Sequence, residues 1–206
     1  MNNPILGFEH IYIDNHSART LLLLHGTGGD EQDLVPIGKV LDSHANILSP
    51  RGKVLEDGML RFFKRLKPGV FDRQDLKDKS VELGNFLVEC SKVYNFPLSG
   101  VVAVGYSNGA NIALHLLTSN PEILARAVLL RPMAAGVADD VADLSNTRLL
   151  ILAGLTDSMV PIENFKELVK NLQNKKAQVR FHELVAGHGL TNQDMAYAQE
   201  WISEVG

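Results

Sequence analysis

Short apolar runs alternate with amphipathic helical patterns along most of this chain, and this alternation constrains the fold more than any other feature. We predict strands at about residues 8–13, 20–25, 45–49, 100–106, 126–131, 148–154 and 178–184. Two of the runs, the leucines that follow Thr20 as far as residue 24 and residues 149–152, are continuously apolar, as is typical of strands buried on both faces of a parallel sheet. The pattern therefore predicts an α/β fold with a mainly parallel sheet of about seven strands and helices on both faces.

Five segments between and after these strands have apolar residues at helical spacing. Their stripes are Leu34, Ile37 and Leu41; Leu83, Phe86, Leu87, Cys90 and Val93; Ala110, Leu114 and Leu117; Phe165, Leu168, Val169 and Leu172; and Met195, Ala198, Ile202 and Val205. Thr191 with Asp194 three residues later resembles a capping box that opens the last helix. A chain of 206 residues with 45% hydrophobic content can bury a sizeable core, which predicts a single domain over residues 1–206.

Composition argues against several classes of protein. The net charge is −4 and no basic run is longer than the pair Lys175-Lys176, so we expect no nucleic-acid partner. The single cysteine, Cys90, lies on an apolar stripe, which favours burial over reactivity and fits a reducing compartment. We find no secretory signal and no apolar run near the ~20 residues that span a bilayer. We therefore expect a cytoplasmic protein that does not insert into membranes.

The pentapeptide Gly105-Tyr106-Ser107-Asn108-Gly109 follows the apolar run 101–104 and leads into a helical pattern. In this context G-x-S-x-G predicts a nucleophile elbow, a sharp turn that presents a serine hydroxyl at the edge of the sheet. The glycines have a steric reason, because strand and helix nearly touch at such a turn. Ser107 is the predicted nucleophile.

A serine nucleophile needs a histidine as base and a carboxylate that orients it, and in α/β-hydrolases these follow in the order serine, acid, histidine. Asp157 comes directly after the strand ending near Leu152, and His188 lies between two glycines after the final strand. The alternatives for the acid are Asp139, Asp140 and Asp143, which follow the preceding strand at a greater distance. We favour Asp157, with His188 as the base.

The other histidines lie in less suitable places. Four precede the serine, His182 lies within the last strand, and His115 lies on the helix after the elbow, about two turns from Ser107. We expect His115 to pack or to form a hydrogen bond at the helix surface. We expect His25 to bond the backbone of its loop.

Acyl transfer also needs two backbone N–H groups directed at the developing oxyanion. We assign one to Asn108, the residue after the nucleophile, and the other to Thr27 in the glycine-rich segment 25–29. This segment fits neither nucleotide-binding pattern, because a dinucleotide site would need glycine where Glu31 stands and no Gly-Lys-Ser/Thr follows. No paired-histidine zinc signature is present, so we expect neither a cofactor nor a catalytic metal.

Two connections bear on access to the site. Residues 51–75 form a long link after a strand, which places them at the carboxyl edge of the sheet. Residues 132–147 are too few for the cap domain that many hydrolases of this architecture insert there. We predict no cap domain and an open site covered mainly by residues 51–75.

Together these segments resemble the bacterial phospholipase/carboxylesterase family of α/β-hydrolases, relatives of the acyl-protein thioesterases. The resemblance runs through HGTGGDEQDL, SPRG, RFFKR, GYSNGAN, GLTDSMVP and GHGL, nearly the full length of the chain. Within the family the chain is most similar to hydrolases of the methylhydroquinone-resistance type. The resemblance implies esterase activity on a small-molecule ester, with Ser107, Asp157 and His188 as the triad and Thr27 and Asn108 at the oxyanion. It also suggests a homodimer.

The segment 61–65, RFFKR, has two interpretations. Arg61 could pair with a carboxylate or phosphate of the substrate while Phe62 lines an acyl pocket. Alternatively the phenylalanines anchor the link in the core and the charges pair with Glu56, Asp57 or Asp72. We favour the structural role. Arg131, directly after a strand, has the same two interpretations, as does Arg51.

The leading hypothesis is a serine carboxylesterase that forms an acyl-enzyme on Ser107. Two alternatives stay open. The same site could hydrolyse thioesters or lysophospholipids, or the chain could be a non-catalytic ligand-binding protein on a hydrolase fold. The retention of all three triad residues argues against the last of these.

Overall fold

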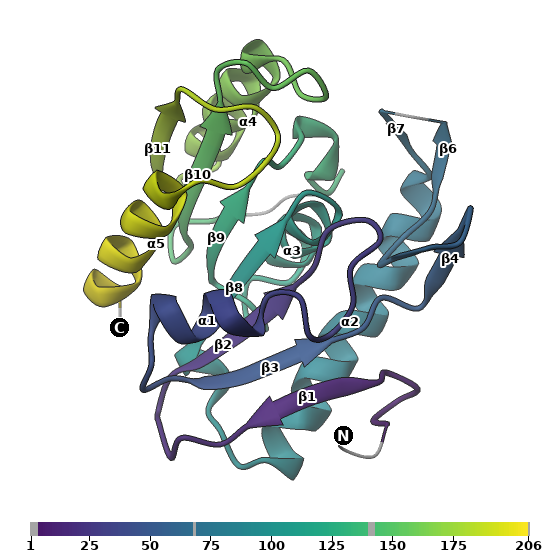
Figure 1. The fold of residues 1–206 in the computed structure, drawn as a ribbon, viewed down its shortest axis with the longest axis vertical. Helices are drawn as coiled ribbons and strands as arrows, with labels where there is room; N and C mark the ends of the chain where they lie inside the picture. The colour runs from purple at the N-terminus through teal and green to yellow at the C-terminus, as the bar shows by residue number, and fades with distance from the viewer. Residues whose placement is uncertain (1–3, 68, 140–142, 206) are drawn as a thin grey trace.

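A seven-stranded sheet forms the centre of the computed structural model, which describes residues 4–67, 69–139 and 143–205 (Figure 1). The strand order is β1-β3-β2-β8-β9-β10-β11. β1 pairs antiparallel with β3, and the other neighbours in this sheet pair in parallel. The strands are β1 (His10–Ile13), β2 (Thr20–Leu24), β3 (Asn46–Pro50), β8 (Val101–Tyr106), β9 (Arg126–Leu130), β10 (Arg148–Gly154) and β11 (Gln178–Leu184). The seven predicted strands are confirmed within a few residues.

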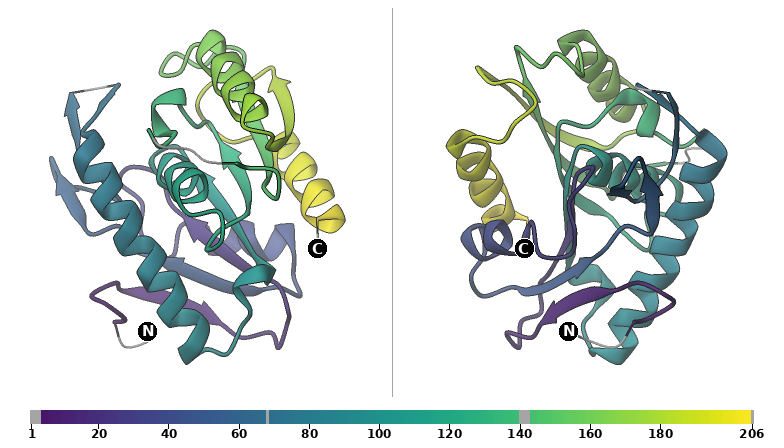
Figure 2. Two further views of the ribbon diagram at one scale, coloured as in Figure 1. Left: turned by 180° about the vertical axis from the view of Figure 1, so that it is seen from behind. Right: turned by 45° about the vertical axis from the view of Figure 1, so that its right-hand side comes forward.

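Helices cover both faces of the sheet (Figure 2). α2 (Arg73–Val93), α3 (Asn108–Ser119) and α4 (Ile162–Asn174) cover one face, while α1 (Val35–Leu41) and α5 (Asn192–Glu204) cover the other. Successive side chains of a strand point to opposite faces. Accordingly, Leu22 and Leu24 join the core beneath α2 to α4, whereas Leu21 and Leu23 join the core beneath α1 and α5. Both cores are buried, as the continuous apolar runs predict.

Two local predictions about the helices are confirmed. The Thr191 side chain and Asp194 form a reciprocal capping box at the start of α5. Cys90 is fully buried in α2, and this burial raises the pKa of its thiol to about 12. Among the described residues, no helix combines the length and apolar character that a bilayer crossing requires.

The long link after β3 carries secondary structure that the sequence analysis did not assign. β4 (Val54–Glu56) and β5 (Met59–Arg61) form one antiparallel hairpin, and β6 (Arg65–Lys67) pairs with β7 (Val70–Phe71). Figure 1 shows both hairpins beyond the carboxyl end of β3, as predicted for a cover of that edge. Between β9 and β10, the described residues form one short 3-10 helix, η2 (Ala134–Gly136), and another, η1 (Leu98–Gly100), precedes β8.

Candidate active site

Ser107 lies at the turn between β8 and α3 in a conformation with positive φ, with φ 50° and ψ −109°. Non-glycine residues rarely adopt this conformation, and it is typical of strained functional turns. The flanking glycines permit it. A Cβ atom on Gly109 would lie 2.0 Å from the carbonyl oxygen of Leu24, and one on Gly105 would lie 2.6 Å from the carbonyl oxygen of Gly109. The structure thus contains the close strand–helix contact predicted from the pentapeptide.

Ser107, His188 and Asp157 form one hydrogen-bonded chain. Nε2 of His188 lies 2.9 Å from Oγ of Ser107, and Nδ1 lies 2.8 Å from Oδ2 of Asp157. An ionised carboxylate only accepts hydrogen bonds, so Nδ1 donates to Asp157 and Nε2 is left to accept from the serine hydroxyl. The elements place each residue at the same edge of the sheet, because Ser107, Asp157 and His188 follow β8, β10 and β11.

The Asp157 carboxylate is held from both sides. Its side chain has no solvent-exposed surface, and its Oδ1 accepts from the backbone N–H groups of Met159 (2.8 Å) and Val160 (3.0 Å). Two of the alternative acids form ion pairs elsewhere: Asp139 with Arg73, and Asp143 with Lys176. Asp140 lies outside the described residues. Of the described alternatives, Asp157 alone contacts His188.

The two expected oxyanion donors border the same cavity as Ser107. Within the described ranges, neither the backbone N–H of Thr27 nor that of Asn108 donates to a protein acceptor. Asn108 is the first residue of α3, where backbone N–H groups lack intrahelical acceptors. Both donors are therefore available to a ligand.

His25 has the structural role expected of it. Its Nε2 accepts from the backbone N–H of Gly52 at 2.9 Å, and its Nδ1 donates to the carbonyl of Gly26 at 2.7 Å. The ring is buried against Phe62, with 4.6 Å between ring centroids, and burial lowers its pKa. His25 thus joins the glycine-rich loop to the start of the covering segment.

Phe62 and Arg131, two of the three candidate substrate contacts, make structural contacts here. Phe62 is 2% exposed, packs in the core, and its backbone N–H donates to Oδ1 of Asn108 at 2.7 Å. Arg131 borders the cavity but has no exposed surface, and it forms a bidentate ion pair with the equally buried Asp194. It also donates to the carbonyls of Gly187 and Gly189, which flank His188. Arg131 therefore positions the histidine loop.

Arg61, the third candidate substrate contact, is buried but also lines the cavity. Its Nη1 donates to Oγ1 of Thr27 at 2.6 Å, and its Nε donates to the carbonyl of Phe63 at 3.1 Å. Glu56 lies 3.7 Å away and also pairs with Arg65. The expected pairing of this segment with Glu56 is confirmed, and Phe63 is fully buried as an anchor.

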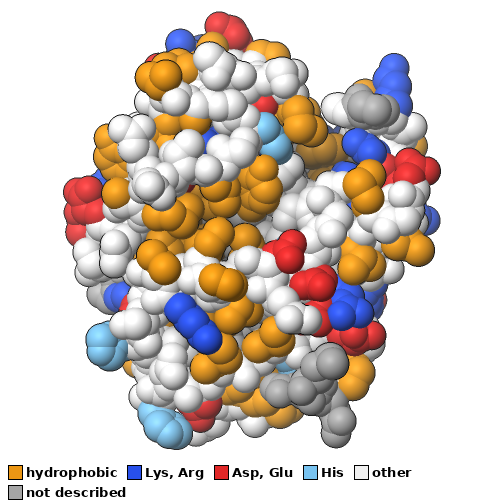
Figure 3. All heavy atoms as spheres, in the orientation of Figure 1, with side chains coloured by type: hydrophobic (Ala, Val, Ile, Leu, Met, Phe, Trp, Pro, Cys, Tyr) orange, Lys and Arg blue, Asp and Glu red, His pale blue; other side chains and the backbone are white. Residues whose placement is uncertain are grey.

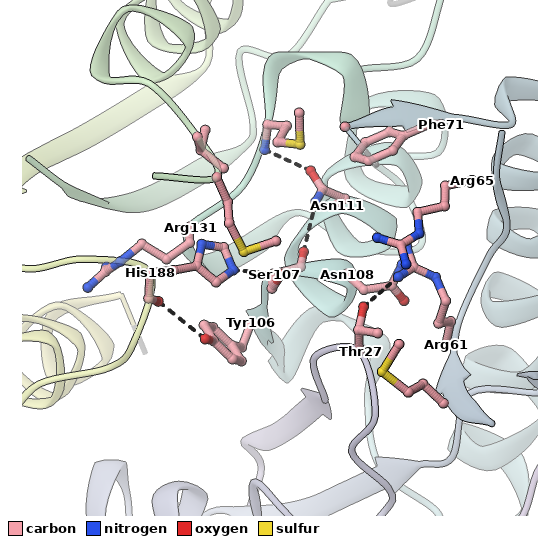
Figure 4. A pocket seen from close by; sticks show the side chains of 15 residues that line it. Thr27, Arg61, Arg65, Phe71, Tyr106, Ser107, Asn108, Asn111, Arg131 and His188 are labelled. Carbon is pink, nitrogen blue, oxygen red and sulfur yellow. Dashed lines mark hydrogen bonds between the residues drawn. The ribbon is translucent and has the colours of Figure 1, made fainter. Parts of the chain in front are cut away.

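The cavity above Ser107 has a volume of about 330 Å³ (Figure 4). Its lining residues are Thr27, Met59, Arg61, Arg65, Gly69, Phe71, Tyr106, Ser107, Asn108, Asn111, Arg131, Met133, Met159, Val160 and His188. In Figure 3 hydrophobic and basic side chains border a hollow at the upper right, between the hairpins and the rest of the molecule.

Sequence reasoning missed Asn111 and the apolar wall of this cavity. Asn111 Nδ2 donates to the carbonyl of Ser107 at 2.8 Å, and its Oδ1 accepts from the backbone N–H of Met133 at 2.8 Å. Asn111 thereby joins the elbow to the segment after β9. Its place one helical turn after the serine was the available signal. Met59, Phe71 and Met159 gave no signal, because two lie in strands of two or three residues and the third lies in a loop, so that no periodicity marks them.

Comparisons with known proteins agree with this geometry. The phospholipase/carboxylesterase family profile matches residues 11–205. A putative hydrolase of Bacillus subtilis, MhqD, is 41% identical over 196 residues, which is 95% of this chain and 98% of that protein. The crystal structure of a Bacillus cereus carboxylesterase matches with a TM-score of 0.92 and 42% identity, covering 97% of this chain and 95% of the other. A carboxylesterase from Mesorhizobium loti matches with a TM-score of 0.89 and 31% identity, covering 95% and 94%.

Proposed function

Since the chain belongs to the phospholipase/carboxylesterase family, has the α/β-hydrolase fold and is a carboxylesterase-type hydrolase, we propose that it cleaves carboxylic esters through an acyl-enzyme on Ser107. The observation that carries the proposal is the chain of two hydrogen bonds from Ser107 through His188 to Asp157 at the floor of a cavity.

The proposed reaction has two halves. Ser107 Oγ attacks the ester carbonyl while its proton passes to Nε2 of His188, and Asp157 stabilises the imidazolium. The backbone N–H groups of Thr27 and Asn108 stabilise the oxyanion, each contributing ~3–4 kcal/mol. The alcohol leaves with the proton from His188. Water, deprotonated by His188, then attacks the acyl carbon and releases the acid and Ser107.

The cavity volume bears on the choice among acyl substrates. A cavity of about 330 Å³ lies at the small end of the range for ligand pockets, ~300–1,000 Å³. It favours a short acyl group over the long chain of a lysophospholipid. Initial rates on short esters, short acyl thioesters and lysophospholipids would rank these three substrate classes, and a higher rate on lysophospholipids would refute the preference for short chains.

The test of the mechanism is labelling by a fluorescent alkylphosphonate, with mass spectrometry to locate the adduct. We expect the adduct on Ser107, and loss of both labelling and ester hydrolysis in Ser107→Ala by a factor of at least ~10³. Full ester hydrolysis by folded Ser107→Ala would refute the acyl-enzyme. Tight binding of small esters without turnover by the wild-type protein would instead support the non-catalytic alternative.

A further inference from the structure

Two arginines share a single carboxylate at one end of the cavity. Nε of Arg61 lies 3.7 Å from Oε2 of Glu56, and Nε of Arg65 donates to Oε1 of the same carboxylate. The Arg61 side chain is 5% exposed, while the side chains of Arg65 and Glu56 are each 21% exposed. One negative charge against two positive charges leaves this corner of the cavity with an excess of one positive charge.

Among the described residues of the cavity wall, no carboxylate balances that excess. The described lining residues include three arginines and no aspartate or glutamate. The charge of the third arginine, Arg131, is met by Asp194 beneath the wall. Burial lowers the pKa of Arg61, Glu56 opposes this lowering, and the charge of Arg65 adds to it. An anion bound here would supply a second negative charge to the two arginines that share Glu56.

The two guanidinium groups also keep unused hydrogen-bond donors. A guanidinium has five N–H donors. Arg61 uses Nε and Nη1, and no partner for its Nη2 occurs within the described ranges. For Arg65, the described contacts account for Nε and leave both terminal nitrogens without a protein partner. Figure 4 shows both side chains extending from the covering hairpins toward Thr27 and Asn108.

The place of His188 indicates which part of a substrate would reach these donors. In the proposed mechanism the leaving alcohol takes its proton from His188, so the alcohol must lie on the His188 side of Ser107. Figure 4 shows Arg61 and Arg65 on the opposite side of Ser107. With the alcohol beside His188 and the carbonyl oxygen at Thr27 and Asn108, the acyl chain is left to extend along the apolar side chains of the cavity wall. Two of these, Met59 and Phe71, lie on the same hairpins as the arginines.

We propose that Arg61 and Arg65 bind a carboxylate at the far end of the acyl group, so that the preferred substrates are monoesters of short dicarboxylic acids. This inference rests on the proposed acyl-enzyme mechanism and adds its substrate class. The ester C–O bond breaks, the acyl carbon bonds first to Ser107 Oγ and then to water oxygen, and the products are an alcohol and a dicarboxylate. Water is the only co-reactant.

The test compares esters that differ only in a terminal carboxylate. Monoethyl succinate is paired with ethyl butyrate, and monoethyl glutarate with ethyl valerate, with released ethanol measured at low ionic strength. We expect kcat/KM to be about tenfold higher for at least one monoester than for its neutral partner, the value of one hydrogen bond to a charged group. The preference should shrink as salt is added, because salt screens charges.

Three variants locate the effect. Arg65→Gln should lower the ratio of monoester to neutral-ester kcat/KM by about tenfold, and Glu56→Gln should raise it, because it removes the competing carboxylate. Arg180→Gln is the matched control, since this exposed arginine pairs with Glu204 on the far side of the sheet and its loss changes the net charge equally. The control should leave the ratio unchanged.

Hydrolysis of the neutral esters without preference for either monoester would overturn the carboxylate site and leave the proposed esterase intact. An unchanged ratio in folded Arg65→Gln would overturn it as well. Absence of hydrolysis of all four esters, together with absence of phosphonate labelling at Ser107, would refute the esterase itself and the carboxylate site with it.

Discussion

Loss of Arg131 should both destabilise the protein and impair its catalysis. Its guanidinium makes five hydrogen bonds while having no exposed surface. Two go to the carboxylate of Asp194, at 2.7 and 3.0 Å, and three go to backbone carbonyls. In Arg131→Met these acceptors would remain buried without this donor.

The expected magnitude follows from the burial. Removing one partner of a buried ion pair costs about 3–5 kcal/mol, because the other charge is left uncompensated. Asp194 would keep its bonds from the backbone N–H and hydroxyl of Thr191, at 2.7 and 2.8 Å, which places the expected loss at the lower end of that range. For a chain of this length a loss of about 3 kcal/mol lowers Tm by about 6–12 °C.

Urea unfolding followed by circular dichroism measures this loss, with Arg180→Met as the control. The Arg180 pair with Glu204 is exposed, so its removal should change the free energy of unfolding by at most about 1 kcal/mol. Arg131→Lys would restore a positive charge beside Asp194 but not the full set of bonds to Gly187 and Gly189. It should therefore regain stability and keep a lowered kcat. If Arg131→Met and Arg180→Met unfold at the same urea concentration, the reasoning is wrong.

Three further changes test other parts of the site and its surroundings. Asp157→Asn should lower kcat by about 10⁴ with little change in KM, because the histidine loses the carboxylate that fixes its tautomer; a loss below tenfold would exclude Asp157 as the orienting acid. Asn108→Ala should lower the free energy of unfolding by about 1–3 kcal/mol, because the buried N–H of Phe62 loses its acceptor; an unchanged urea midpoint would contradict this. Burial lowers the pKa of His115 to about 4, so between about pH 6.5 and pH 4 the unfolded chain binds a proton that the folded chain does not. The free energy of unfolding should fall as the pH falls through that window, and His115→Leu should make its dependence on pH weaker. If the free energy of unfolding depends on pH equally in the two proteins, His115 is not the group responsible.

The sheet could be predicted because its signal is local. Each buried parallel strand is a short apolar run, and each helix carries a stripe at its own spacing. The order of Ser107, Asp157 and His188 follows from the same strands, since residues after successive parallel strands meet at one edge. The sequence was therefore sufficient to predict that these three side chains lie close together.

The covering segment and Arg131 could not be predicted in the same way. β4 to β7 are two or three residues long and pair only within their own hairpins, so they carry no periodicity to detect. The role of Arg131 depends on Asp194, which lies 63 positions later in the chain. An arginine after a strand can face a cavity or lie beneath its wall, and only the tertiary position of its acid decides between them.

The covering segment links substrate recognition to the proposed oxyanion donors. Gly28 donates its backbone N–H to the carbonyl of Leu60 at 2.8 Å, and Arg61 donates to Thr27, so β5 holds the glycine-rich loop. Phe62, the residue directly after β5, donates its backbone N–H to the side chain of Asn108, which ties the same segment to the elbow. The strand that carries Arg61 thus sets the positions of both backbone donors. Changes in residues 59–62 should therefore alter kcat and KM together, whereas changes at Arg65, which contacts neither donor segment among the described hydrogen bonds, should act mainly on the choice of acyl group.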